Sequence, residues 1–204
     1  MDALVAAGAL CVFAAFVHRG WPLVLLAAAG LVAAAWTIGA SLRATPSPWE
    51  LLGLHAFSAR VAACLVAGCM LGLGLGVVCR LGYAYGALPR AVTHFAVVAV
   101  LIGGTEELVY RGYIQGRVRR WGWLGAMALA ALCHAAYKVA VFALPPGEVE
   151  VNFRFLVGAT FLGGLAFGAL RELSGSVLPP LAAHTVFDIV VYGDQAQAPW
   201  WVWS

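Results

Sequence analysis

Seven long apolar runs, separated by short polar breaks, determine what this 204-residue chain can fold into. They cover residues 3–17, 23–42, 61–78, 91–110, 122–144, 153–170 and 177–192. A helix needs about 20 apolar residues to cross a bilayer. Only 10% of the residues are charged, whereas a soluble domain has roughly 25%. The sequence therefore predicts an all-α, polytopic integral membrane helix bundle with about seven (six to eight) transmembrane helices.

We expect a single membrane domain, 1–204, whose N-terminal helices occupy 1–90. The first run has no basic segment before it and begins beside the acidic Asp2, which favours a first membrane helix over a signal peptide. Residues 49–60 mix charged and aromatic residues with leucines, which favours a short interfacial helix leading into the third run. Tryptophans near the end of 193–204 predict an aromatic tail at the membrane interface.

Small residues in the third run predict a close helix–helix contact, because glycines let two backbones approach. They are Gly68, Gly72, Gly74 and Gly76.

The arginines predict an orientation. Alternating the runs across the membrane places one set of arginines on one side: Arg43, Arg60, Arg111, Arg117, Arg119, Arg120 and Arg171. The other side receives Arg19, Arg80, Arg90 and Arg154, with the acidic Glu148 and Glu150. The positive-inside rule then places the first set and the N-terminus in the cytoplasm. The richness in Ala, Gly, Val and Leu favours a bacterial plasma membrane.

Composition also excludes several classes of partner. The sequence has no clustered basic face, so we expect no nucleic-acid partner. Its five cysteines form no C-x-x-C pair, which indicates neither a zinc site nor a disulfide framework. The expected surroundings are the lipid bilayer.

Ionisable residues inside the apolar runs are the main signal for function, since a charge at the centre of a bilayer costs about 2.5–3.5 kcal/mol. Glu106 and Glu107 are consecutive and would point about 100° apart on a helix. Glu107 and Arg111 are at i, i+4 in the favourable order, which predicts a structural ion pair. Glu106 is left without a partner nearby in the sequence and is a credible general base.

Two later runs carry further ionisable groups. His134 is followed by Lys138 four residues later, and His184 by Asp188 at the same spacing. A carboxylate at i+4 predicts that Asp188 orients the His184 imidazole and fixes its tautomer.

Two chemistries fit these residues, and both lead to hydrolysis of an amide bond within the membrane. In one, Glu106 activates a water molecule with the help of a histidine, and the other groups stabilise the oxyanion. In the other, His134, His184 and Glu106 hold a divalent metal such as zinc. The absence of a helical H-E-x-x-H motif favours the first.

The order of these motifs resembles the CPBP family of intramembrane proteases, which includes the eukaryotic CaaX prenyl endopeptidases of the Rce type and the bacterial Abi relatives. The family pattern is E-E-x-x-x-R, then F-x-x-x-H, then H-x-x-x-N or D, with a glycine-rich helix before the last motif. The sequence matches these motifs with Glu106 to Arg111, His134, residues 161–168 and His184 to Asp188. The resemblance covers roughly 92–192 and identifies 91–192 as a catalytic core.

The resemblance implies an intramembrane endopeptidase that cleaves a membrane protein or peptide. Glu106 with His134 would activate the water, His184 with Asp188 would polarise the scissile carbonyl, and Glu107 with Arg111 would hold the helix geometry. The glutamate-dependent mechanism, without a cofactor, is favoured over the metal-dependent one. The resemblance is compatible with either a C-terminal anchor or a signal segment as the substrate.

Two departures from the family pattern bear on these roles. Ala130 stands where the family usually has phenylalanine, which predicts a loss of packing rather than of chemistry. An ionised Asp188 cannot donate a hydrogen bond to an oxyanion as asparagine can, so it would have to be protonated, or orient His184 or a metal.

Two other functions are compatible with the sequence. A non-catalytic membrane scaffold of the same fold is one, although such a protein would be expected to lose Glu106, His134 or His184. A small proton-coupled transporter is the other, and it would predict an internal repeat that the sequence does not contain.

Overall fold

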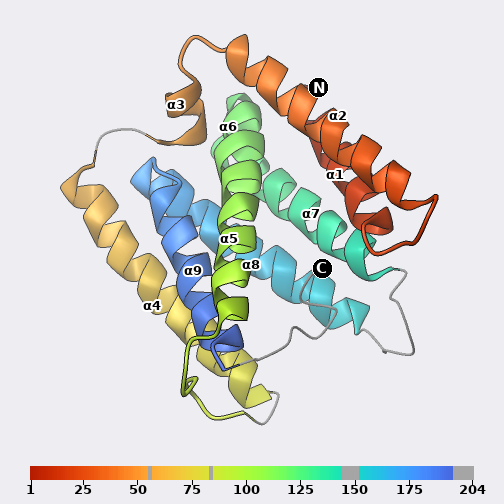
Figure 1. Ribbon diagram of the computed structural model, residues 1–204. Helices are drawn as coiled ribbons and strands as arrows, with labels where there is room; N and C mark the ends of the chain where they lie inside the picture. The colour runs from red at the N-terminus through yellow and green to blue at the C-terminus, as the bar shows by residue number, and fades with distance from the viewer. Residues whose placement is uncertain (55–56, 83–84, 144–151, 195–204) are drawn as a thin grey trace.

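The structure, a computed structural model, describes residues 1–54, 57–82, 85–143 and 152–194, and all of its regular elements are helices (Figure 1). In chain order they are α1 (Asp2–Phe16), α2 (Val24–Arg43), α3 (Pro48–Leu52), α4 (Ala59–Gly82), α5 (His94–Glu107), the π-helix η1 (Leu108–Ile114), α6 (Gln115–Val118), the 3₁₀-helix η2 (Arg119–Trp121), α7 (Trp123–Phe142), α8 (Phe153–Ser174) and α9 (Leu178–Tyr192).

Each of the seven apolar runs is confirmed as a helix or as the start of one. α2, α4, α7 and α8 are long and apolar enough to cross a membrane, and α1 and α9 are shorter apolar helices. The remaining run continues from α5 through η1 into α6 as one rod. The chain is therefore a multi-pass membrane helix bundle, as the composition predicts.

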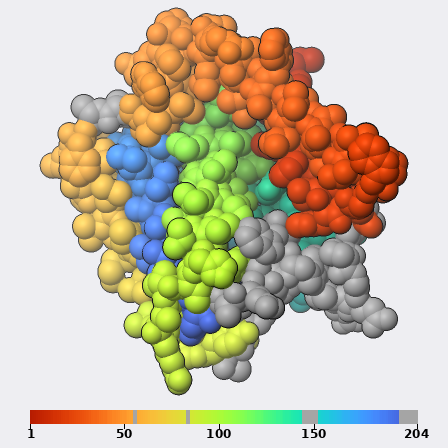
Figure 2. Space-filling model, viewed as in Figure 1, coloured from red at the N-terminus to blue at the C-terminus, as the bar shows by residue number. Residues whose placement is uncertain are grey.

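The α5–α6 rod runs through the middle of the molecule. α9 and then α4 lie along one side of it, α7 with α1 and α2 lie on the other, and α8 packs on α7 (Figures 1 and 2). The largest buried cluster joins alanines of α1 and α7 to Tyr110, Tyr113 and Ile114 of η1. The ends of α5 and η1 are thus enclosed by neighbouring helices, and the functional groups of the chain lie there.

Three of the four glycines named above form the predicted close contact of α4, with α9. A side chain at Gly68 would meet the Pro179 carbonyl oxygen at 2.5 Å, and one at Gly72 would collide with the backbone of Ala183. Gly76 faces Val190 in the same way. A side chain at Gly74 would face open space, so the prediction is wrong for that position. Gly68, Gly72 and Gly76 are four residues apart and share one helix face, and Gly74 lies on another face.

The interfacial helix predicted over 49–60 is shorter than expected. α3 ends at Leu52, because Gly53 has a left-handed backbone (φ 72°) and lies against the Arg171 guanidinium, where a side chain would collide. Arg60 belongs to α4 instead. The acidic loop with Glu148 and Glu150, and residues 195–204 of the aromatic tail, lie outside the described residues.

Three of the arginines used to predict the orientation are buried rather than at a membrane surface. Arg80, Arg111 and Arg171 are at most 3% exposed. The cytoplasmic N-terminus stays a prediction, carried by the remaining arginines.

Candidate functional site

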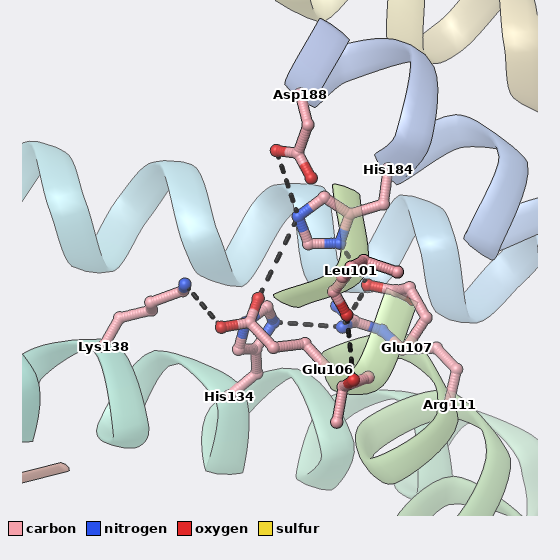
Figure 3. Close-up of polar contacts among 9 residues, drawn as sticks. Leu101, Glu106, Glu107, Arg111, His134, Lys138, His184 and Asp188 are labelled. Carbon is pink, nitrogen blue, oxygen red and sulfur yellow. Dashed lines mark hydrogen bonds and ion pairs between the residues drawn. The ribbon is translucent and has the colours of Figure 1, made fainter. Parts of the chain in front are cut away.

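Seven ionisable residues from four elements converge between α5, α7 and α9 (Figure 3). Glu106 and Glu107 end α5, Arg111 lies in η1, and the others lie on two facing helices: His134 and Lys138 on α7, and His184 and Asp188 on α9. His134 is roughly 16 Å along the axis from the start of α7, about half of a 30 Å hydrocarbon core. The structure therefore brings together every residue that the sequence predicted for the site.

Glu106 points toward α7 and uses both carboxylate oxygens there. Lys138 Nζ donates to Oε1 at 2.6 Å, and His134 Nε2 is 3.2 Å from Oε2. Glu106 is 6% exposed. The structure supplies partners that the sequence does not show, because Lys138 is 32 residues away and cannot be seen from local spacing. The ion pair favours the charged carboxylate that a general base requires.

Glu107 points away from Glu106, as the helical offset predicts. Arg111 Nη1 donates to Glu107 Oε1 at 2.9 Å, so the predicted i, i+4 pair is present. The same oxygen lies 2.9 Å from His184 Nδ1. Glu107 is fully buried. It therefore links η1 to α9 in addition to holding Arg111.

The contacts of His134 fix its tautomer. Arg111 Nη1 lies 3.0 Å from His134 Nδ1, and a guanidinium can only donate, so Nδ1 is the acceptor. A neutral imidazole then has its proton on Nε2, the atom that faces Glu106. His134 consequently donates to Glu106 and orients it, and Glu106 is the group free to take a proton.

His184 is oriented by Glu107 and not by Asp188. Its Nδ1 donates to Glu107 Oε1, because an ionised carboxylate only accepts. Its Nε2 lies 3.8 Å from Asp188 Oδ1 and 3.9 Å from Glu106 Oε2, both too long for a hydrogen bond. The prediction that Asp188 fixes the tautomer is therefore wrong. Nε2 faces the Glu106 carboxylate across a gap that a reacting group or a water can bridge.

Aromatic rings pack against both histidines. Tyr110 stacks on His134 with ring centroids 4.6 Å apart, and the Phe167 ring lies 5.7 Å from His184 and 5.6 Å from the Arg111 guanidinium. Ala130, at the usual phenylalanine position, is buried in the same cluster as Tyr110. Tyr110 thus supplies an aromatic contact to this histidine, and neither aromatic partner was predicted from the sequence.

Gly103 allows α5 and α9 to come together at the site. A side chain there would collide with Asp188 Oδ2 and meet His184 Cδ2 at 2.9 Å, whereas one at the adjacent Gly104 would meet nothing within 4 Å. The sequence shows the pair of glycines but gives no signal for which of them faces α9.

The site also includes a feature that local sequence does not signal. The backbone changes from α-helix to π-helix directly after Glu107, so Arg111 lies in the π-helical segment. Such segments are rare and occur often at functional sites. Lys138 is a signal that the sequence does show, because a lysine within an apolar run is costly and marks function.

The donor set does not fit a divalent metal held by Glu106, His134 and His184. The Lys138 ammonium is bonded to Glu106 Oε1, and His134 directs one nitrogen at Arg111 and an N–H at Glu106. Within the described residues, no group of three or more His, Cys, Asp or Glu side chains is arranged to hold a metal ion. Because His134 Nδ1 accepts from Arg111, its Nε2 carries the proton of the neutral ring and has no lone pair to offer a metal.

Comparison with known proteins gives one finding. A family model described as type II CAAX prenyl endopeptidase, Rce1-like, matches residues 88–190, which is half of the chain and includes all seven residues of the site. No curated protein and no solved structure matches the chain.

Proposed function

Because the chain belongs to the Rce1-like family of type II CAAX prenyl endopeptidases, we propose that it is an intramembrane endopeptidase. It hydrolyses a peptide bond of a membrane-associated protein or peptide, at the level of the bilayer where Glu106 and His184 meet. The family implies a protein substrate, and the depth of the site favours a substrate segment that itself lies in the membrane.

Glu106 is the general base of the proposed reaction. Its Oε2 lies 3.9 Å from His184 Nε2, and a water to the side of this pair would lie within hydrogen-bond reach of the carboxylate. Glu106 accepts a proton from this water as the water oxygen attacks the scissile carbonyl carbon. His134 and Lys138 hold the carboxylate in position through one oxygen each.

His184 stabilises the charge that develops on the carbonyl oxygen. Its Nδ1 donates to Glu107, which leaves Nε2 turned toward the gap. The nearby negative charges of Glu107 and Asp188 favour a protonated imidazole, whose Nε2–H donates to the oxyanion. The proton held by Glu106 then passes to the leaving nitrogen as the C–N bond breaks, which yields a carboxyl and an amine product.

The observation that carries the proposal is the opposition of a fixed carboxylate and a fixed imidazole inside a buried cluster. The Glu106 side chain is held by Lys138 and His134, and the His184 ring by Glu107. Groups fixed in this way lose little entropy on reaching the transition state. A scaffold or a transporter does not require this pairing of base and donor.

The test uses purified protein in vesicles with a panel of prenylated C-terminal peptides and apolar membrane peptides. We expect the wild type to cleave at least one peptide and Glu106→Gln to lose cleavage by roughly 10²-fold or more, since general-base catalysis contributes that much. Glu50→Gln, at an exposed position in α3, is the matched control and should cleave normally. Cleavage by Glu106→Gln at the wild-type rate would contradict the proposed role.

The same assay tests the metal-free mechanism. We expect a strong chelator to leave the wild-type rate unchanged, and the purified protein to contain no stoichiometric zinc. Loss of activity with the chelator, restored by added metal, would favour the metal-dependent alternative.

A further inference from the structure

Lys138 is the only lysine in the sequence, and every other position counted as lysine or arginine is arginine. It lies within the apolar helix α7, and its side chain is 19% exposed. Figure 3 shows it reaching from α7 toward Glu106, with Asp188 at the top of the view on α9, beyond His184. A compact ammonium at this single place suggests a specific use.

The balance of negative and positive side chains in the cluster indicates what Lys138 does there. Three carboxylates are buried there, and each is at most 6% exposed: Glu106, Glu107 and Asp188. Arg111 neutralises Glu107, and His134 is a neutral donor. Without Lys138, Glu106 and Asp188 would share one histidine as their only counter-charge within the described part of the cluster. Leaving a buried charge uncompensated is strongly destabilising.

Asp188 has the weaker direct contacts of the two acids. Its Oδ1 is 3.8 Å from His184 Nε2, and its buried Oδ2 has no hydrogen-bond partner among the described residues. Glu106 and Asp188 both lie within 4 Å of the same His184 nitrogen, so the two acids share one imidazole. Lys138 pairs with Glu106, which leaves the charge of His184 to Asp188. A neutral amide at position 188 would not require this compensation.

We propose that Lys138 is a positioning residue that holds Glu106 Oε1 and offsets the charge of Asp188. Holding Oε1 turns Oε2 toward His184, and offsetting Asp188 allows three acids to remain ionised in a buried site. This inference deepens the proposed function, because the position it assigns to Glu106 is the one the reaction uses. It couples Lys138 to Asp188, so the charge of Asp188 becomes harmful once Lys138 is removed.

The decisive experiment is a double-mutant cycle of thermal stability on the full chain in detergent: wild type, Lys138→Met, Asp188→Asn and the double variant. We expect Lys138→Met to lower Tm by roughly 5–15 °C, the effect of breaking a buried ion pair. Asp188→Asn should raise the Tm of Lys138→Met while leaving that of the wild type equal or lower. A Tm change from Asp188→Asn that is the same in both backgrounds would overturn the inference.

A second measurement keeps the lysine in place, so it does not depend on the stability of Lys138→Met. In protein labelled at lysine with ¹⁵N and ¹³C, the side chain gives one NMR signal, because the chain has one lysine. Glu106→Gln and Asp188→Asn should each shift this signal. Asp194→Asn should not, because Asp194 pairs with Arg80 outside this cluster. A signal unaffected by Asp188→Asn would show that the two charges are not coupled.

Kinetics separate this inference from the proposed function. Lys138→Met should lower kcat by roughly 10²-fold with little change in KM, as expected when a positioned base is released, and the double variant should recover part of the loss. An unchanged kcat would overturn the positioning role. If the wild type cleaves no peptide, the proposed function fails, and the Tm cycle still decides whether Lys138 and Asp188 are paired.

Discussion

Glu107 Oε1 accepts from two side chains at the same distance, 2.9 Å from Arg111 Nη1 and 2.9 Å from His184 Nδ1. One buried oxygen therefore fixes the position of η1 relative to α9. Its neighbour Glu106 forms its side-chain hydrogen bonds with α7 and faces His184 of α9 at 3.9 Å. Two adjacent glutamates thus have different functions, one in orienting the imidazole and one in binding the proton.

Glu107→Gln should weaken both folding and activity. The substitution leaves the buried Arg111 guanidinium without its counter-charge, which we expect to lower the free energy of unfolding by about 3 kcal/mol. It also loosens His184, so kcat should fall. Unfolding in denaturant and kinetics on the same preparation measure both effects, with Glu50→Gln as control. A variant as stable and as active as this control would contradict the role given to Glu107.

At the residue scale, local spacing predicts a contact only when both partners lie on one helix. Glu107 and Arg111 are four residues apart, and their pair is present. His184 and Asp188 have the same spacing, yet Glu107 orients the histidine, because a carboxylate on α5 is closer than the one on its own helix. Lys138 and Glu106 are brought together only by the packing of α7 on the rod.

At the scale of elements, α5 and α9 meet where Gly103 leaves no side chain between them. Because a methyl group at Gly103 would collide with the Asp188 carboxylate and contact His184, and one at Gly104 would face open space, the two positions form a matched pair. Their contrast tests whether the close approach of the helices is required for activity.

Gly103→Ala should lower activity by roughly 10²-fold, since displacing a catalytic group by about 1 Å costs that much. Gly104→Ala should retain wild-type activity and stability, because alanine favours a helix over glycine. Peptide cleavage in vesicles compares the two. Equal activities of the two variants would show that the α5–α9 contact does not set the geometry of the site.

The helices could be predicted from the sequence because apolar runs of this length have few alternatives in a membrane. The end of α3 and the π-helix could not. The first depends on Gly53 meeting Arg171, which is distant in the sequence, and the second on a change in backbone hydrogen bonding that composition does not indicate.

At the scale of the whole molecule, an ion pair outside the site joins elements at the end of the bundle remote from α3 (Figure 1). Buried Arg80, near the end of α4, contacts Asp194 beyond α9 at 2.8 Å, and Asp194 also accepts from the Arg90 backbone before α5. The hydrogen bond from Arg80 lowers the pKa of Asp194 to about 2. This contact joins the three helices that enclose one side of the site.

Its contribution to stability should depend on pH. A carboxyl group whose pKa is lowered by folding stabilises the folded state above its unfolded pKa of 3.8, and this stabilisation is lost as the pH falls toward 2. The Tm of the wild type should therefore exceed that of Asp194→Asn at pH 6, and the difference should shrink between pH 4 and pH 2. A difference that stays constant over this range would contradict the assignment.

The measurement that tests the central claim most directly compares protein termini, in the membrane and secreted fractions, between native cells and cells that carry only Glu106→Gln. We predict that the termini of a small set of membrane-associated proteins shift in the variant, or that these proteins remain membrane-bound, while the Glu106→Gln protein is expressed and folded normally. These proteins would be the substrates. Identical termini in both kinds of cell, with the variant folded at its native level, would contradict an intramembrane endopeptidase.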